Sequence, residues 1–259
     1  MTVVALLTDF GLRDTFVAEL KASLLRLGPA DLTLVDVTHR ISPGDIAGGR
    51  WALQRIWGQW PKGSIILAVV DPGVGTDRPA VVAAADGCYF VGPGNGLAAF
   101  LANHPDLEIV RLDPATATPP PGIEASTTFH GRDLFAPAAA RLAAGAALAD
   151  LGEPGKVEDL GAPLPVESDC TVVWIDRFGN VITDLARDSA VGRLLDGGAE
   201  ITVQDQPVRG PVQAFADAGV DELVWYWGSG GTLEIALDSE RAATRLDARP
   251  GLVIPLPGT

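Results

Sequence analysis

The pattern of apolar residues changes between the two halves of the chain, and this change constrains the fold more than any other feature. Short apolar runs typical of buried strands come first, at Val3–Leu7, Leu32–Val37 and Ser64–Val70. Between them lie residues 14–27 and 45–59, whose apolar side chains recur at helical spacing. Because strands and helices of this length alternate, we predict an α/β domain with right-handed crossovers and a mostly parallel central sheet.

The first predicted domain, residues 1–152, also contains strands outside this alternation. Ala80–Ala85 and Cys88–Val91 flank Asp86-Gly87, a dipeptide typical of tight hairpin turns. We therefore predict a hairpin there, followed by one more strand and two helices. These are expected at Glu108–Leu112, at about residues 97–103 and in the Ala-rich stretch that ends near residue 148.

The second half of the chain is different in character. Residues 153–166 are punctuated by Gly and Pro and are predicted to form a linker. In the C-terminal domain, residues 167–259, helical patterns fade and short apolar runs follow one another at the spacing of an antiparallel barrel or sandwich. The expected strands are residues 171–175, 181–182, 200–203, 208–212, 222–227, 232–237 and 252–256.

The charge of the chain limits its partners. Its 259 residues include 33 acidic and 19 basic side chains, a formal net charge of −14. Nucleic acids and anionic membranes need a basic patch, so neither is expected as a partner. No apolar run reaches membrane-spanning length, and the N-terminal segment lacks a signal-peptide pattern. Cys88 and Cys170 lie far apart inside apolar runs, so we expect buried free thiols in a cytoplasmic protein.

A polar turn follows the third predicted strand. Asp71, Pro72, Gly73 and Gly75 arrive together, and Arg78 comes shortly afterwards. Pro72 fixes one φ angle and the glycines allow angles that other residues resist, so the turn can be tight. Open α/β sheets build their sites at the carboxyl ends of central strands, which makes this turn a candidate site. The alternative is a plain strand-ending turn with a surface ion pair between Asp71 and Arg78.

Acidic residues and histidines fall at the predicted strand ends, at Asp9, Asp71 and His130. His130 stands out because Gly, Arg and Asp surround it just before a helix, which is poor core composition. A base, a carboxylate and an arginine brought together could bind and orient a water molecule. For His39 a structural role at the end of the second strand is favoured over a place near the site, and His104 is expected to be exposed and inert.

Other kinds of chemistry find less support. The sequence contains no closely spaced ligand pair, such as HxH or HExxH, that would support a hydrolytic metal site. The GxSxG elbow of serine hydrolases is absent, and Gly92–Gly96 lacks the GxGxxG spacing of a dinucleotide site. We therefore expect no metal and no cofactor. The four residues weighed as metal ligands are Asp9, Asp71, His130 and Asp133.

Two polar interruptions break the strand pattern of the second half. They are the segment around Phe178 and Asn180 and the segment Gly228–Gly231. Each alone is more often a hairpin turn than a site. Together they could form the rim of a ligand site, in which Phe178 stacks on a flat heterocycle and the Asn180 amide hydrogen-bonds its edge.

Motifs along nearly the whole chain resemble one known family. In order and spacing they resemble the S-adenosyl-L-methionine (SAM) hydroxide adenosyltransferases, which are kin to the fluorinase and chlorinase. No single motif is decisive, but the ordered set is highly specific. The motifs are Thr8–Gly11, Val70–Thr76, Gly92–Gly96, Thr128–Asp133, Asp176–Asn180 and Ser229–Glu234.

This resemblance implies an N-terminal α/β domain joined to a smaller C-terminal antiparallel β-barrel. It also implies a homotrimer in which each site lies between the N-terminal domain of one subunit and the C-terminal domain of the next. The implied reaction splits SAM with water into adenosine and L-methionine and uses no metal.

The resemblance also implies roles for individual residues. The family's catalytic triad corresponds to Asp71, Arg78 and His130, and Asp9 corresponds to the carboxylate that holds the ribose hydroxyls. The other implied substrate-binding positions are Phe10 and Asn95, Asp176 and Ser229 around the methionine end, and Phe178 and Asn180 at the adenine.

Two positions depart from the family pattern. Gly94 stands where relatives often have Asp, and Asp184 stands where Asn often follows the threonine. Neither belongs to the triad, so the departures affect the expected ligand contacts and not the expected chemistry.

The chemistry implied by the resemblance is physically consistent. The sulfonium makes methionine a neutral leaving group, so the protein needs only an aligned oxygen nucleophile, and alignment contributes roughly 7–11 kcal/mol. Asp71 and His130 can both accept a proton from water, and the sequence leaves open which one does. A SAM-dependent halogenase is disfavoured because Asp71 would repel a halide where the fluorinase and chlorinase have tyrosine. A non-catalytic SAM or adenosine sensor would not need the triad.

Overall fold

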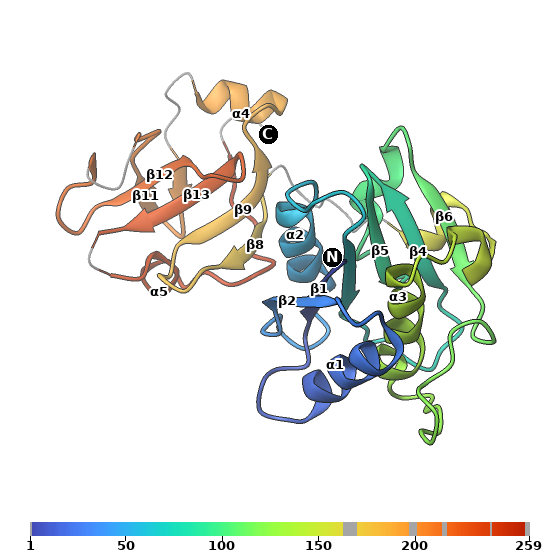
Figure 1. Ribbon diagram of the computed structural model, residues 1–259. Coiled ribbons are helices and arrows are strands. Elements are labelled where there is room, and N and C mark those ends of the chain that lie inside the picture. The colour runs from blue at the N-terminus through green and yellow to red at the C-terminus, as the bar shows by residue number, and fades with distance from the viewer. Residues whose placement is uncertain (1, 163–169, 197–200, 214–216, 239, 257–259) are drawn as a thin grey trace. The chain divides into compact units, whose positions relative to one another are not determined.

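The computed structural model describes residues 2–162, 170–196, 201–213, 217–238 and 240–256. The chain divides into two compact units, Met1–Leu164 and Pro165–Thr259 (Figure 1). No helix in the described ranges is long and apolar enough to cross a membrane.

The first unit is built on a seven-stranded sheet. Its strands are β1 (Val3–Thr8), β2 (Thr33–Thr38), β3 (Ile65–Val69), β4 (Ala80–Ala85), β5 (Cys88–Pro93), β6 (Glu108–Leu112) and β7 (Gly152–Pro154). The spatial order is β2-β1-β3-β5-β4-β6-β7, and the first four neighbours are parallel. Strand β4 is antiparallel to β5 and β6, and β7 is antiparallel to β6, so five of the seven strands share one direction. The predicted mostly parallel sheet is confirmed.

The hairpin predicted between β4 and β5 is also confirmed. Asp86 and Gly87 have φ angles of 53° and 73°. Positive φ at both central residues matches the twist of the flanking strands.

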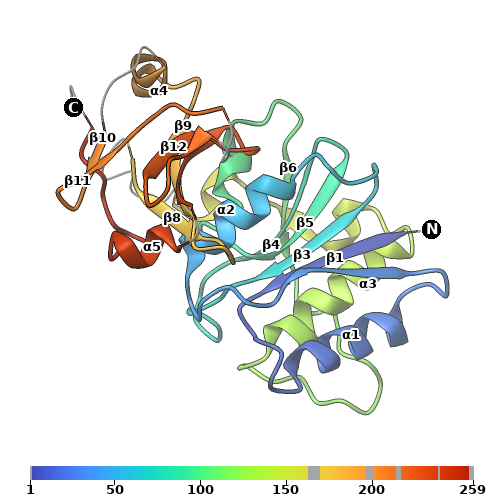
Figure 2. The ribbon, with the colours of Figure 1, turned by 90° about the vertical axis from the view of Figure 1, so that its left-hand side faces the viewer.

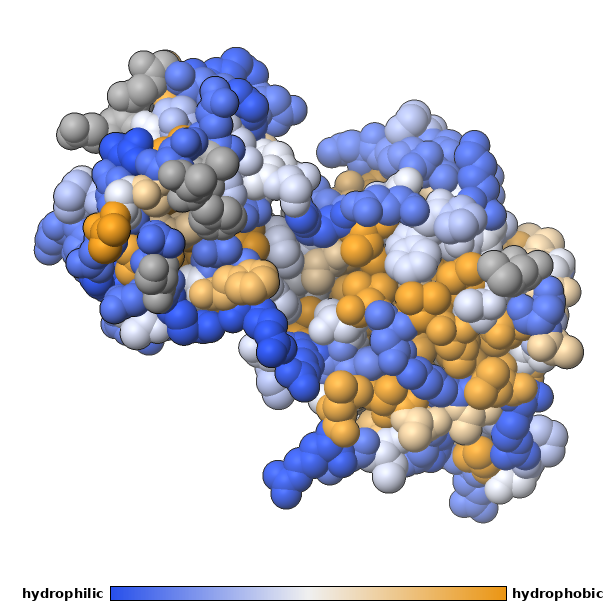
Figure 3. Space-filling view, turned by 60° about the vertical axis from the view of Figure 1, so that its left-hand side comes forward, coloured by the Kyte–Doolittle hydropathy of each residue, from blue (hydrophilic) through white to orange (hydrophobic). Residues whose placement is uncertain are grey.

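Helices cover both faces of the sheet (Figure 2). The helices α1 (Phe16–Leu27) and α3 (Ala136–Ala143) pack together on one face, and α2 (Ile46–Ile56) lies on the other. Leu20 and Leu24 of α1 are fully buried against alternate residues of the strands, which follows from the helical spacing of these two leucines. Figure 3 shows hydrophobic side chains gathered over one face of this unit.

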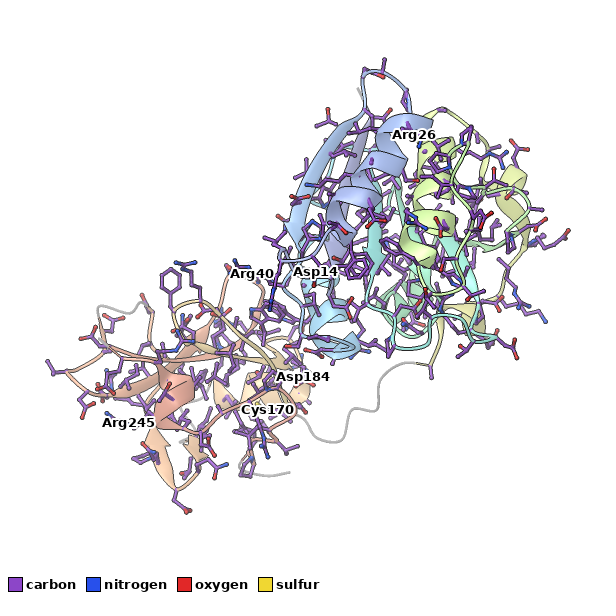
Figure 4. The ribbon with its side chains drawn as sticks, turned by 90° about the horizontal axis from the view of Figure 1, so that it is seen from below. Asp14, Arg26, Arg40, Cys170, Asp184 and Arg245 are labelled. Atoms are coloured by element: carbon purple, nitrogen blue, oxygen red, sulfur yellow. The ribbon has the colours of Figure 1, made fainter. Side chains whose placement is uncertain are left out.

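Three local expectations for the first unit need correction. The helix expected from residue 14 begins at Phe16; Asp14 lies in the preceding turn (Figure 4), and Thr15 Oγ1 donates to Glu19 Oε1 at 2.7 Å. The helix expected at about residues 97–103 is a 3₁₀-helix, Ala99–Asn103. The segment expected as a linker contributes β7 and the 3₁₀-helix Val157–Leu160 to this unit, and Leu160 O accepts from Gly96 N at 2.8 Å.

The second unit consists mainly of antiparallel strands, as predicted. The sheet order is β12-β13-β9-β8, and β10 and β11 form a separate pair. A closed barrel is not seen, because the strands of the described ranges form two open sheets. Residues 252–256 contribute only an isolated bridge from Val253 to Thr171, and two short helices were not expected. The elements are β8 (Val172–Ile175), β9 (Val181–Ala186), α4 (Ala190–Leu195), β10 (Ile201–Val203), β11 (Gln206–Val208), β12 (Leu223–Trp227), β13 (Thr232–Leu237) and α5 (Ala242–Arg245).

Candidate active site

Two carboxylates lie at the same edge of the first unit's sheet. Strands β1 and β3 are parallel neighbours with Thr8 opposite Val69, and Asp9 and Asp71 follow them. Asp9 N donates to Val69 O at 3.3 Å, which ties the two strand ends together. The polar residues therefore lie where open α/β sheets place their sites.

Arg78 joins Asp71 to His130. Its Nε donates to Asp71 Oδ1 at 2.9 Å and to Oδ2 at 3.0 Å, and its Nη2 also bonds Oδ2. The same Nη2 lies 3.0 Å from His130 Nδ1. The side chains of Asp71 and Arg78 are only 4% and 10% exposed. The structure thus brings the three residues together, and the alternative of a surface ion pair is wrong.

The contact with Arg78 determines the protonation of His130. A guanidinium can only donate, so Nδ1 must accept and the imidazole is neutral with its proton on Nε2. Burial lowers the pKa of His130, and the positive charge of Arg78 lowers it further, against smaller opposing effects of Asp71 and Asp133. His130 therefore presents a donor at Nε2, whereas the carboxylate oxygens of Asp71 act as acceptors.

The backbone of the Asp71 turn explains how Arg78 returns to the carboxylate. Val74 N donates to Asp71 O at 3.3 Å, and Thr76 Oγ1 donates to Gly73 O at 2.7 Å. Gly75 has a φ of +80°, and a Cβ there would lie 3.0 Å from Thr127 O. A larger residue at position 75 would be strained and would also push against the segment that carries His130.

His130 is followed by one turn of π-helix, Gly131–Phe135, a feature often found at functional sites. Arg132 donates to Asp133 Oδ1 and Oδ2 at 2.6 and 2.9 Å and to Glu19 Oε2 at 2.8 Å. Asp133 Oδ2 also accepts from Ser126 N at 2.8 Å. The Asp133 carboxylate therefore braces this segment and is not free to bind a metal as considered from the sequence.

Phe135 supports the site, and the sequence reasoning did not identify it. The Arg78 guanidinium lies 5.3 Å from the centre of its ring. The His130 ring packs edge-on against it, with centroids 6.4 Å apart and planes at 81°. Its position two residues after the motif Thr128–Asp133, directly before an Ala-rich helix, was the only signal in the sequence.

Asp9 and Phe10 have different surroundings. Asp9 Oδ2 accepts from Gly44 N at 2.8 Å, and burial raises the pKa of its carboxyl group. Phe10 packs edge-on against Phe16 and Phe129, with centroids 6.2 and 5.7 Å apart. Asp9 can accept further hydrogen bonds, whereas Phe10 belongs to an aromatic cluster.

Asn95 is committed to the backbone beside Asp71. Its Nδ2 donates to Val70 O at 2.8 Å, and its Oδ1 accepts from Leu97 N at 3.3 Å. It therefore holds the residue before Asp71. At the neighbouring Gly94, a Cβ would lie 2.0 Å from Asp159 O, so the aspartate often found in relatives would require this segment to move.

The predicted residues of the second unit lie in two turns. Asp176 Oδ1 accepts from the backbone N of Phe178 and Asn180, each at 2.8 Å, and Oδ2 accepts from Asn180 Nδ2 at 2.9 Å. Phe178 is 76% exposed, and both of these Asn180 bonds use its N–H groups as donors. Ser229 lies in the turn between β12 and β13.

Asp184 and Glu234 of the second unit both accept hydrogen bonds within that unit. Asp184 Oδ1 accepts from Thr171 N at 2.6 Å, so this departure from the family pattern braces the start of β8 (Figure 4). Glu234, which closes the last motif, is buried and accepts from Tyr226 Oη at 3.0 Å. Burial, followed by the charge of Glu234, raises the pKa of Tyr226.

Within the residues that the structure describes, no group of three or more His, Cys, Asp or Glu side chains is arranged to hold a metal ion.

Comparisons with known proteins place the chain in a family. An "(R)-S-adenosyl-L-methionine hydrolase" of Thermus thermophilus is 40% identical over 99% of this chain and 100% of its own length. A fluorinase of an Actinoplanes species is 26% identical, over 97% of this chain and 96% of its own. A crystal structure of an uncharacterized conserved protein from Thermotoga maritima matches with a TM-score of 0.83 at 31% identity and covers 96% of this chain and 97% of its own. Family models for the SAM hydroxide adenosyltransferase N-terminal and C-terminal domains match residues 4–152 and 170–254, and the chain therefore belongs to this family.

Proposed function

We propose that this protein hydrolyses SAM to adenosine and L-methionine. The observation that carries the proposal is the buried Asp71–Arg78–His130 contact at the edge of the sheet. The high identity to a relative named as a SAM hydrolase supports it. The name of that relative specifies the (R) form, so we include the (R) epimer at sulfur among the substrates.

In the proposed mechanism a water molecule attacks C5′ of the ribose. Its oxygen forms the new C–O bond while the C5′–S bond breaks, and the electron pair of that bond remains on sulfur as methionine leaves. Asp71 accepts the proton that the water loses, because a carboxylate keeps lone pairs beyond those bonded by Arg78. His130 donates from Nε2 to the water oxygen and orients it. Asp9 accepts hydrogen bonds from the two ribose hydroxyls and so holds C5′ in line with the attacking water and the leaving sulfur.

The binding roles of the other residues complete the proposal. Phe178 and Asn180 contact adenine, and Ser229 binds near the methionine end. Asn95 and Asp176 act indirectly, because the first supports Val70 and the second braces its own loop. Phe10 lines the ribose side through its aromatic cluster.

The proposed assembly is a homotrimer in the cytoplasm, with sites formed between subunits. Exposed apolar side chains such as Leu12 and Phe16 on the first unit support a subunit contact. Buried free thiols at Cys88 and Cys170 support a reducing compartment. Light scattering of the purified protein measures the number of subunits.

The test of the function is incubation of purified protein with each SAM epimer in buffer, with and without chloride or fluoride. Adenosine and methionine in equal amounts are expected by chromatography in every case. A 5′-halogenated nucleoside formed with halide would identify a halogenase instead. SAM binding without adenosine would identify a sensor.

Activity is expected to fall at acid pH. Because the pKa of His130 lies below its ordinary value of 6.5, the neutral imidazole persists at neutral pH and is lost only below that value. Protonation at Nδ1 would set two donors against each other at the Arg78 contact, so kcat should decrease only once the pH falls below that ordinary value. A pH profile of kcat checks this, and a kcat that rises in acid would contradict the assigned neutral state.

A further inference from the structure

His39 lies buried beneath the loop that carries Asp9. It follows β2, is only 3% exposed, and its Nδ1 lies 2.8 Å from the Oγ1 of the fully buried Thr8. On the other side of the ring, Nε2 lies 3.1 Å from Asp36 Oδ1, a close approach that does not meet hydrogen-bond geometry. Asp36 Oδ2 in turn contacts Lys21 Nζ at 2.7 Å on α1. A chain of polar contacts therefore runs from the surface to the end of β1.

The hydrogen bonds around Thr8 are all satisfied when the hydroxyl donates to the imidazole. Thr8 Oγ1 accepts from Phe10 N at 3.2 Å and has one proton of its own, which His39 Nδ1 can accept at 2.8 Å. His39 then carries its proton on Nε2, facing Asp36. The hydroxyl both supports the backbone of the loop and is itself fixed by the imidazole.

His39 also holds the same loop through its backbone. Its carbonyl accepts from Gly11 N at 2.8 Å, and the side-chain contact fixes Thr8. Asp9 lies between these two attachment points and has its own bonds to Val69 O and Gly44 N. The orientation of the Asp9 carboxylate is thus set by contacts from the ends of β2, β3 and the segment before α2.

We propose that His39 is a positioning residue that aims the Asp9 carboxylate at the two ribose hydroxyls through Thr8. It touches neither substrate nor water in this role. The inference rests on the proposed function, because it takes Asp9 as the ribose-binding group. The structural role that the sequence favoured for His39 is thereby extended to recognition of the ligand.

The test compares binding of adenosine and 2′,3′-dideoxyadenosine by calorimetry. Hydrogen bonds from two hydroxyls to a carboxylate should make the wild type prefer adenosine by at least about tenfold. His39→Ala and Thr8→Val should reduce this preference to within about threefold, because the carboxylate is no longer aimed. His39→Asn should retain most of it, because the Asn amide can accept from the Thr8 hydroxyl near the position of Nδ1.

Loss of packing alone would weaken both ligands equally and leave the preference intact, so that result overturns the proposal. His104→Ala serves as the matched control, because His104 is partly exposed beside Asp106 and should leave the preference unchanged. Circular dichroism shows whether each variant is folded. If His39→Ala does not fold, the ligand preferences of Thr8→Val and His39→Asn decide whether the proposal holds.

The proposed function can fail separately from this inference. A wild type that neither binds adenosine nor hydrolyses SAM overturns the function. A wild type that prefers adenosine, an Asp9→Ala variant that loses the preference, and Thr8→Val and His39→Ala variants that keep it would overturn only the role of His39.

Discussion

Replacing Asp71 with Asn is expected to lower kcat for SAM hydrolysis by about 10²–10⁴-fold, the usual contribution of a positioned general base. The amide matches the carboxylate in shape and still accepts from Arg78, so the turn should remain folded. It cannot accept a proton from water. Because Asp71 is proposed to touch the water and not the substrate, the Kd for SAM should change by less than about threefold.

Asn is a better test than Ala at this position. Ala would remove every acceptor that Asp71 offers to the buried Arg78 N–H groups, whereas the Asn oxygen still accepts from them, so Ala would confuse loss of chemistry with loss of folding. Asp106→Asn is the matched control, because its carboxylate is 59% exposed beside His104 in the first unit. Single-turnover kinetics measures the effect on the hydrolysis step, and calorimetry measures the Kd for SAM. Full turnover by Asp71→Asn would show that the assigned water site is wrong.

Replacing Arg78 with Lys is expected to lower kcat by about 10²-fold, the scale of a misplaced catalytic group. The positive charge is kept, but an ammonium lacks the planar fork that reaches Asp71 and His130 together. Asp71 and His130 would then no longer be held in one geometry. The Kd for SAM should remain close to that of the wild type.

The same substitution has a second expected effect. The guanidinium is one of the causes that lower the pKa of His130, so moving the charge away from Nδ1 should raise that pKa. The acid limb of the kcat profile should therefore move to higher pH. Arg187→Lys is the control, since Arg187 is 59% exposed and pairs with Asp196 at 3.1 Å. An unchanged kcat together with an unchanged pH profile in Arg78→Lys would remove Arg78 from the mechanism.

Much of the fold could be predicted because its signals are local. The apolar run at Ser64–Val70 became β3, and the Asp86-Gly87 dipeptide became the predicted hairpin turn. The errors arose where pairing between distant segments decides the structure. Strand β7 exists because Gly152–Pro154 pairs with β6, and nothing in its Gly- and Pro-rich sequence indicates a strand.

The sequence could nominate candidate residues for the site but not the contacts that those residues make. Asn95 and Asp176 were expected to bind substrate directly, yet their described hydrogen bonds go to Val70 and to the loop of Asp176 itself. A carboxylate or amide looks the same in the sequence whether its partners are ligand atoms or backbone atoms. Only the positions of those partners distinguish the two cases.

The sequence by itself determined the alternation of strands and helices, the polar turn after β3 and the family, because each depends on residue types at short spacings or on ordered motifs. The tertiary structure alone decided that Arg78 turns back to Asp71 and reaches His130, and hence that the imidazole is neutral. It also decided that His39 lies under the Asp9 loop. The physical reason is that a hydrogen bond between residues 52 positions apart depends on where the sheet brings their backbones, which local pattern does not encode.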